Sequence, residues 1–151
     1  MIKNRIIAQL YCEGHGRSDV AKNSTAVQVG DFVTLDGGAV TAATAGKRID
    51  GLSNHTKTFS AINETVSKEK LVYVKSGPTL LVEVDIDGGT VTAEDEGKYF
   101  DLKDAHTVDG TTESTDFAVV PAFGSPVAFK QLRLVRFVSA TRGVFAVVYS
   151  A

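Results

Sequence analysis

The chain has 151 residues, of which 43% are hydrophobic, and carries a formal net charge of −2. This length and composition predict one folded domain with a sizeable core and exclude a globally disordered chain. The near-neutral charge gives no general argument for a nucleic-acid partner, and no run approaches the ~20 apolar residues of a membrane-spanning helix. The single cysteine, Cys12, excludes an intrachain disulfide.

Residues 1–24 are expected to form an N-terminal arm and loop, ahead of a single β-rich domain over residues 25–151. Residues 2–10 are suited to an extended strand, whereas residues 13–24 are polar and contain the glycine, asparagine and serine typical of a loop. Charged and polar residues interrupt the first segment too often for the core of a signal peptide. We therefore expect a protein made in the cytoplasm without export.

From residue 27 onward, short apolar stretches separated by turn residues predict a succession of strands. The expected strands are 27–35, 39–44, 48–53, 58–66, 71–75, 79–86, 98–102, 117–120, 127–138 and 144–149. Residues 103–116 are polar, acidic and rich in threonine, and are expected to form a surface loop. The best helical window, residues 64–71, lacks a sustained apolar stripe. The fold class is therefore all-β, a small β-barrel or β-sandwich of short antiparallel strands with an extended N-terminal arm.

An internal repeat supports the expectation of turns. The stretch Asp36–Lys47 returns fifty-one residues later as Asp87–Lys98, with eight of twelve positions identical. Asp-Gly-Gly favours the positive φ angles of a tight hairpin, Val-Thr-Ala favours an extended chain, and Gly-Lys indicates a second reversal. Both copies are therefore expected to form hairpins, and the repeat is scaffold used twice, with an acidic insert in the second copy only.

Candidate catalytic and metal-binding residues are few. Cys12 and His15 supply two soft ligands where zinc needs three or four, and His55 and His106 lie in polar sequence without a carboxylate partner in view. A calcium-loop interpretation of residues 85–96 fails because strand-forming residues stand where ligands are needed. The sequence predicts no catalytic, cofactor or metal site and a protein that is not an enzyme, with thiol chemistry at Cys12 and His15 as the alternative.

The charge is distributed unevenly along the chain. Between residues 83 and 116 lie eleven of the eighteen acidic residues against two lysines, whereas residues 127–151 hold four basic residues and no acidic one. Such asymmetry can orient docking on a charged partner. The candidate charged docking surface comprises Glu94, Asp95, Glu96, Lys130, Arg133 and Arg136. Strand alternation places Lys130 and Arg136 on one face and Arg133 on the other, which argues against a continuous basic stripe for nucleic acid.

The order of turns and strands resembles that of bacteriophage capsid decoration proteins, also called cement proteins. The similarity lies in Val29–Gly38, in Val40–Gly46, in the Val-Tyr-Val and Gly-Pro-Thr-Leu-Leu-Val-Glu-Val strands, and in the closing strands Leu132–Val138 and Arg142–Val148. It covers about residues 27–149. The motifs that carry it are turn and strand patterns, which many β proteins share.

The resemblance implies a structural virion protein that binds the outer surface of an assembled capsid and stabilises it, with the major capsid protein as partner. It also implies a homo-oligomer, with a trimer favoured, and an N-terminal arm that pairs with capsid strands. The arm residues expected to contact the capsid are Ile2, Lys3, Arg5, Ile6, Ile7, Tyr11 and Arg17. The alternative is a β-rich carbohydrate- or receptor-binding module, which needs an exposed aromatic platform that a chain with no tryptophan and four tyrosines supplies poorly. Neither function involves nucleic acid or a membrane.

Overall fold

The computed structural model describes residues 4–9, 16–60, 66–77, 80–120, 123–124 and 126–150, and these form strands, turns and one short 3₁₀ helix. The strands are β1 Arg5–Gln9, β2 Gly16–Lys22, β3 Ala26–Val27, β4 Phe32–Asp36, β5 Ala39–Ala42, β6 Gly51–Ser53, β7 Lys57–Thr58, β8 Val66–Lys75, β9 Leu80–Asp87, β10 Tyr99–Asp104, β11 Thr107–Ser114, β12 Ala118–Val119, β13 Ala128–Phe129, β14 Leu132–Ser139 and β15 Arg142–Val147. The 3₁₀ helix, η1, spans Ala93–Asp95. The expected all-β class is confirmed. No helix in the described ranges is long and apolar enough to cross a membrane.

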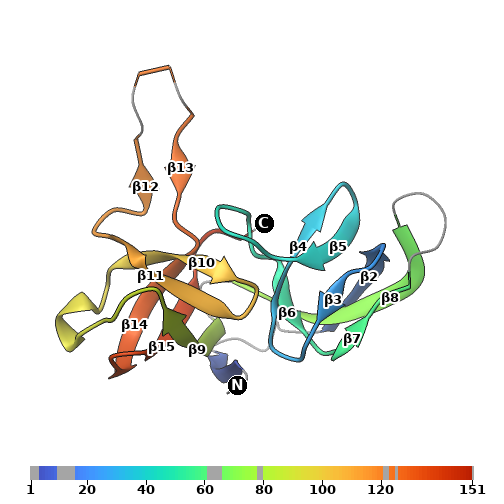
Figure 1. Ribbon diagram of the computed structural model, residues 1–151, viewed down its shortest axis with the longest axis horizontal. Coiled ribbons are helices and arrows are strands. Elements are labelled where there is room, and N and C mark those ends of the chain that lie inside the picture. Colours follow the sequence, from blue (N-terminus) through green and yellow to red (C-terminus); the bar gives the residue numbers. More distant parts are fainter. Residues whose placement is uncertain are drawn as a thin grey trace.

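Two closed barrels lie side by side (Figure 1). The first is the ring β2-β5-β4-β6-β8, and the second is the ring β9-β11-β10-β14-β15, closed by pairing of β15 with β9. Strand β1 is added to the second barrel, where it pairs with residues 80–83 of β9 while β11 pairs with residues 85–87. Closure removes most of the free sheet edges that an open sandwich would leave. The structure thus selects barrels from the two architectures that the sequence allowed.

The two copies of the repeat differ in secondary structure, and Gly89 in the second copy lacks the positive φ that Gly38 has in the first. In the first copy, Gly37 and Gly38 both have positive φ and join β4 to β5 in a two-residue hairpin, as expected. The expected second hairpin is wrong, because after β9 the chain enters the 3₁₀ helix η1, where the backbone N–H of Thr92 donates to Asp95 Oδ2 at 2.8 Å. The acidic insert that distinguishes the second copy supplies this capping carboxylate. A hydrogen bond between a side chain and the nearby backbone thus accompanies a 3₁₀ helix in the second copy, where the first copy forms a strand and turn.

Three polar segments form strands that the sequence did not predict. The described part of the expected loop 13–24 contains β2, the expected loop 103–116 contains β11, and the weak helical window 64–71 lies largely in β8. Strand β11 is rich in threonine, a β-branched residue suited to strands, and it is held between a parallel pairing with β9 and an antiparallel pairing with β10. These segments are strands because they pair with strands distant in the sequence, and not because apolar residues alternate along them.

The two barrels share part of one hydrophobic core. The larger buried cluster joins Phe32, Ala43, Ile49 and Leu52 of the first barrel to side chains of the second, among them Phe100 and Phe145. A smaller cluster, which includes Phe59, Leu71 and Tyr73, fills the first barrel alone. A backbone hydrogen bond of 2.7 Å from Phe32 N–H to Ala105 C=O also crosses the junction. The junction is therefore a packed interior and fixes the barrels relative to each other.

Candidate interaction surface

A two-stranded hairpin projects from the second barrel, away from both barrels (Figure 1). It consists of β12 and β13, which pair with each other only, through Ala118 with Phe129 and Val119 with Ala128. At its base, the N–H of Lys130 donates to the C=O of Phe117 at 2.8 Å. An isolated two-stranded hairpin is marginally stable in water. Its strands gain no sheet neighbour in the part of the chain that the structure describes.

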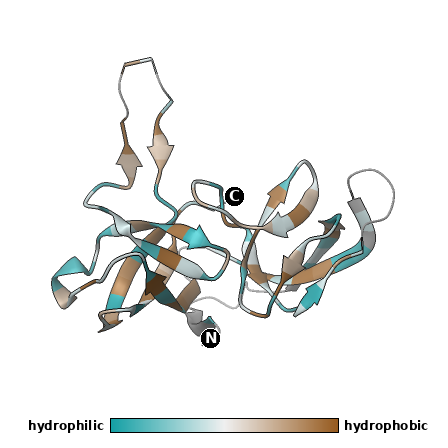
Figure 2. Ribbon diagram, in the orientation of Figure 1, coloured by the Kyte–Doolittle hydropathy of each residue, from teal (hydrophilic) through white to brown (hydrophobic). Residues whose placement is uncertain are grey.

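The hairpin is uncharged and exposes apolar side chains. No charged residue occurs from Phe117 to Phe129, and Figure 2 shows brown to pale colours along its two strands. Among the described residues, five of the eight exposed large hydrophobic side chains lie here: Val119, Val120, Phe123, Val127 and Phe129. Val120 is 78% exposed and Phe123 is fully exposed. Apolar side chains gathered on a projecting element indicate a contact surface for another molecule.

A row of four aromatic rings crosses the base of the hairpin. Ring centroids lie 5.9 Å apart between Tyr99 and Phe117, 5.3 Å between Phe117 and Phe129, and 5.5 Å between Phe129 and Tyr149. Interplanar angles of 48°, 33° and 47° show that the rings are tilted against one another rather than coplanar. No sequence pattern predicts this row, since its members come from four separate segments. It supplies the aromatic surface that composition alone made improbable.

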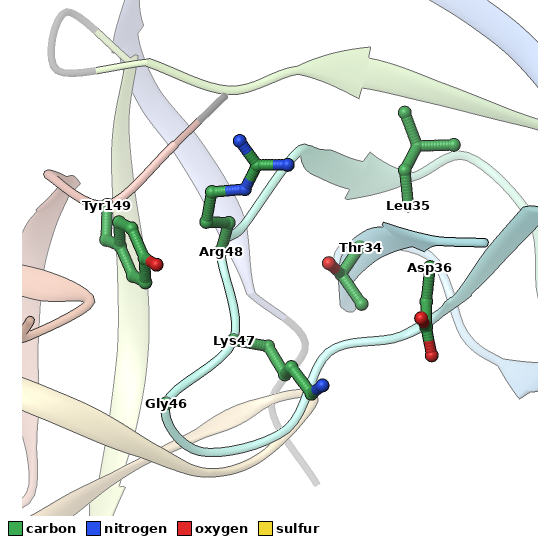
Figure 3. Close-up of a pocket in the computed structure, with 7 residues that line it drawn as sticks. All are labelled: Thr34, Leu35, Asp36, Gly46, Lys47, Arg48 and Tyr149. Atoms are coloured by element: carbon green, nitrogen blue, oxygen red, sulfur yellow. The ribbon is translucent and has the colours of Figure 1, made fainter. Parts of the chain in front are cut away.

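A polar cavity of about 340 Å³ lies beside the last ring of this row, and we call it the basic cavity (Figure 3). Its lining residues are Thr34, Leu35, Asp36, Gly46, Lys47, Arg48 and Tyr149. Figure 3 shows Arg48 between Tyr149 and Thr34, and Lys47 between Gly46 and Asp36. Asp36 forms an ion pair of 2.7 Å with Lys22. The hydrogen bond from Lys22 holds the pKa of Asp36 below its ordinary value, and the charge of Lys47 acts in the same direction.

The predicted charged docking surface is only partly available. Lys130 forms an ion pair of 3.0 Å with Asp101, and Asp95 is buried, caps η1 and pairs with Lys98 at 2.8 Å. The hydrogen bond from Lys98 holds the pKa of Asp95 below its ordinary value. Both residues therefore stabilise the second barrel itself.

The remaining members of that set do gather on one surface. Glu94 is exposed on η1, and Glu96 accepts a hydrogen bond of 2.9 Å from the N–H of Phe137 in β14. Arg133 and Arg136 are both exposed on β14. A register shift between Leu134 and Arg136 breaks the strict alternation, so the expectation that these arginines lie on opposite faces is wrong.

Of the predicted capsid-contact residues, Ile2, Lys3 and Tyr11 lie outside the described residues. Arg5, Ile6 and Ile7 belong to β1, whose backbone pairs antiparallel with β9 of the same chain, Arg5 opposite Glu83 and Ile6 opposite Val82. Arg17 is exposed on β2. Residues 5–9 therefore contribute to the second barrel, and the contact with a capsid stays a prediction.

The catalytic candidates give no assembled site in the described ranges. Cys12 and His15 lie outside them. No group of three or more histidine, cysteine, aspartate and glutamate side chains within the described ranges is placed to hold a metal ion. His55 packs edge-on against Phe59, with ring centroids 5.8 Å apart.

His106 is not the isolated, solvated histidine that its sequence context indicated. Its Nδ1 lies 3.3 Å from Asp31 Oδ1 and its Nε2 lies 3.5 Å from Asp104 Oδ1. Asp31 precedes β4 in the first barrel, whereas His106 lies in the turn between β10 and β11 of the second. Burial raises the pKa of Asp31 above its ordinary value. This carboxyl and imidazole meet across the junction of the barrels, which no local pattern could have indicated.

Comparisons with known proteins do not place the chain in a family. No protein-family description matches the sequence, and no curated protein matches it.

Proposed function

We propose that this chain is a structural virion protein that binds the outer surface of an assembled bacteriophage capsid and stabilises it, with hairpin β12–β13 as its docking element. Two things support the proposal: the sequence resemblance, and the uncharged hairpin that projects from the double barrel and exposes Val120 and Phe123. Stabilising a shell needs no catalytic group. It needs a rigid body, a contact surface and many repeated sites, because contacts on a symmetric shell reinforce one another.

The mechanism follows from binding only the assembled state. A side chain such as Phe123, fully exposed in the free protein, gains about 1.5–3 kcal/mol when it is buried in a partner. If the partner groove is formed only when capsid subunits meet, every bound copy raises the free energy needed to separate them. The partner is then the major capsid protein, and the protein is located on the capsid exterior. A homo-oligomer, with a trimer favoured, remains part of this proposal and is measured by the mass of the free protein.

The experiment compares two variants that remove equal numbers of exposed apolar side chains. Val120→Ser with Phe123→Ser alters the hairpin, and Val135→Ser with Val138→Ser alters β14, where the side chains are 37% and 42% exposed. Each purified protein is cosedimented with empty, expanded heads of the phage that encodes the chain. We expect the hairpin variant to lose binding at least about tenfold and the β14 variant to bind as wild type. Equal binding by both variants would refute the hairpin as docking element, and absence of binding by wild type would refute the function.

Deletion of residues 1–24 is not a useful test of an arm. It would remove β1 and β2, which pair with β9 and β8 in the two barrels. Lost binding would then report misfolding. The hairpin substitutions avoid this problem because their side chains project into solvent.

The aromatic row favours a second candidate function, a β-rich carbohydrate- or receptor-binding module. Sugar rings stack on exposed aromatic faces, and Phe129 is 38% exposed beside Tyr149. The mutual tilt of the rings weakens this candidate, since a flat platform requires coplanar faces. Binding of the labelled protein to an array of immobilised glycans tests it. Selective binding that Phe129→Ala abolishes would support this second function over the first.

A further inference from the structure

The basic cavity has two cationic side chains, Lys47 and Arg48, that form no ion pair with a described residue. Lys22 already pairs with Asp36, the carboxylate of the lining, at 2.7 Å. The other nearby carboxylate, Asp50, is buried and accepts hydrogen bonds from the N–H of Leu35 at 2.7 Å and the hydroxyl of Thr34 at 3.3 Å. Lys47 and Arg48 are exposed, and Asp36, although it interacts electrostatically with Lys47, forms its ion pair with Lys22. The cavity therefore offers two positive charges to a ligand.

The loop that carries these charges is fixed in place. Buried Gln131 of the second barrel donates from Nε2 to the C=O of Thr44 at 2.8 Å and to the C=O of Lys47 at 2.6 Å. The N–H of Ile49 donates to the C=O of Tyr149 at 2.9 Å, and the hydroxyl of Ser76 donates to the C=O of Ile49 at 2.7 Å. Both barrels thus hold the loop at its two ends. A preorganised backbone reduces the ordering entropy that a partner must overcome on binding.

The cavity also adjoins the proposed docking element. Tyr149 lines the cavity and packs on Phe129, the last residue of β13. In Figure 1 the connection between β5 and β6 lies near the base of the hairpin. A partner that covers Phe129 and Tyr149 at the base of the hairpin contacts one wall of the cavity and comes close to Lys47 and Arg48. Leaving these charges unpaired beside the partner would be costly, so we expect the partner to supply a negative charge there.

We propose that the basic cavity seats a carboxylate side chain, aspartate or glutamate, of the protein surface on which the hairpin docks. This inference rests on the proposed function and adds the chemistry of the partner. The guanidinium of Arg48 offers the planar, two-pronged geometry that matches a carboxylate, and Lys47 adds a second point charge. The ring of Tyr149 forms one wall. The hairpin supplies apolar contact area, and the cavity sets the orientation of docking.

A first experiment tests the cavity without any capsid. The ¹⁵N-labelled full-length protein is titrated with N-acetylglutamate N-methylamide and, separately, with the uncharged glutamine analogue at constant ionic strength. We expect saturable shifts of the Gly46, Lys47 and Arg48 amide signals with the carboxylate probe, none with the analogue, and none in a Lys47→Ala/Arg48→Ala variant. Equal shifts with both probes, or no saturable shift with either, would overturn the inference.

A second experiment measures binding to the empty heads. Lys47→Glu/Arg48→Glu reverses the cavity charges, and Lys70→Glu/Lys75→Glu makes the same change of net charge at exposed positions of β8. We expect the cavity variant to bind at least about tenfold more weakly and the β8 variant to stay within about twofold of wild type. Equal weakening by both would reduce the effect to net charge and overturn the inference, while the proposed function stands. Failure of wild type to bind heads would refute both.

Discussion

Gln131 provides the sharpest test of how the two barrels are joined. Its side chain is fully buried and forms three hydrogen bonds, donating to the carbonyls of Thr44 and Lys47 and accepting from the N–H of Leu102 at 2.8 Å. The substitution Gln131→Met keeps the length of the side chain and removes all three. The N–H of Leu102 and the C=O of Lys47 then lose the partner that Gln131 supplies, whereas the C=O of Thr44 still accepts from the N–H of Lys47 at 3.3 Å.

The size of the effect follows from these three groups. Only the N–H of Leu102 is in a buried hydrogen bond, and leaving it without a partner costs about 1–3 kcal/mol, whereas the carbonyls of the exposed residues Thr44 and Lys47 can bind water. The apolar methionine recovers part of this, and the loop can shift to admit water. We expect a net loss of about 1–2 kcal/mol in the free energy of unfolding, against the ~5–15 kcal/mol that stabilises a typical domain.

Urea unfolding followed by circular dichroism measures this loss. With a slope of about 2 kcal/mol per molar urea, the midpoint should fall by roughly 0.5–1 M. Val135→Met on β14 is the control, because this side chain is 37% exposed, and it should stay within about 0.5 kcal/mol of wild type. Amide exchange should also accelerate over residues 44–49, the loop that Gln131 holds. A Gln131→Met protein within 0.5 kcal/mol of wild type would refute the reasoning, since the buried hydrogen bonds would then contribute nothing net.

Three further predictions concern the core, the junction and the hairpin. Because one hydrophobic cluster joins both barrels, they should unfold together, and amide exchange at Val33 and Phe145 should report one global free energy; two separate transitions would contradict this. Burial raises the pKa of Asp31; the charge of Asp104 acts in the same direction and the charge of His106 opposes it. Because the folded state favours the protonated carboxyl, the contribution of Asp31 to the free energy of unfolding is fully present below pH ~3.9 and is lost as pH rises through the folded-state pKa. Asp31→Asn should therefore gain stability relative to wild type between pH 3 and pH 7 in urea titrations, and a pH-independent difference would argue against a raised pKa. Phe123→Ser should leave the thermal midpoint of the free protein within about 2 °C, because the ring contacts solvent, and a larger drop in a melting curve would show that the hairpin packs on the barrels.

Local sequence signals were reliable where a short stretch carries its own constraint. Asp36-Gly37-Gly38 sets a two-residue turn between β4 and β5 because both glycines adopt positive φ. The alternation of Leu80, Val82, Val84 and Ile86 predicted β9, and all four side chains are buried. The same reasoning failed for the second Asp-Gly-Gly, since Asp95 caps a 3₁₀ helix there. The turn itself also differs, because Gly89 lacks the positive φ of Gly38.

The candidate surfaces depended on contacts between distant residues. Uncharged residues 117–129 were visible in the sequence, but their alternation only predicted ordinary strands. That β12 and β13 project as an isolated pair follows from the absence of a further strand pairing with them among the described residues. Likewise, Tyr99, Phe117, Phe129 and Tyr149 are separated by up to fifty residues, and only barrel closure brings them into one row.

The sequence by itself determined the all-β class, the first hairpin and most of the buried strand positions, because φ preferences and period-two burial act over a few residues. The tertiary structure alone decided that the chain forms two barrels with a shared core. Strand pairing in the folded chain makes the polar segments β2 and β11 strands. Folding also brings Lys47 and Arg48 into one cavity lining with Tyr149. Strand partners, ion pairs across the junction and the exposure of a hairpin depend on which distant segments meet. That choice is made by the free energy of the whole packed chain, which no local window of residues contains.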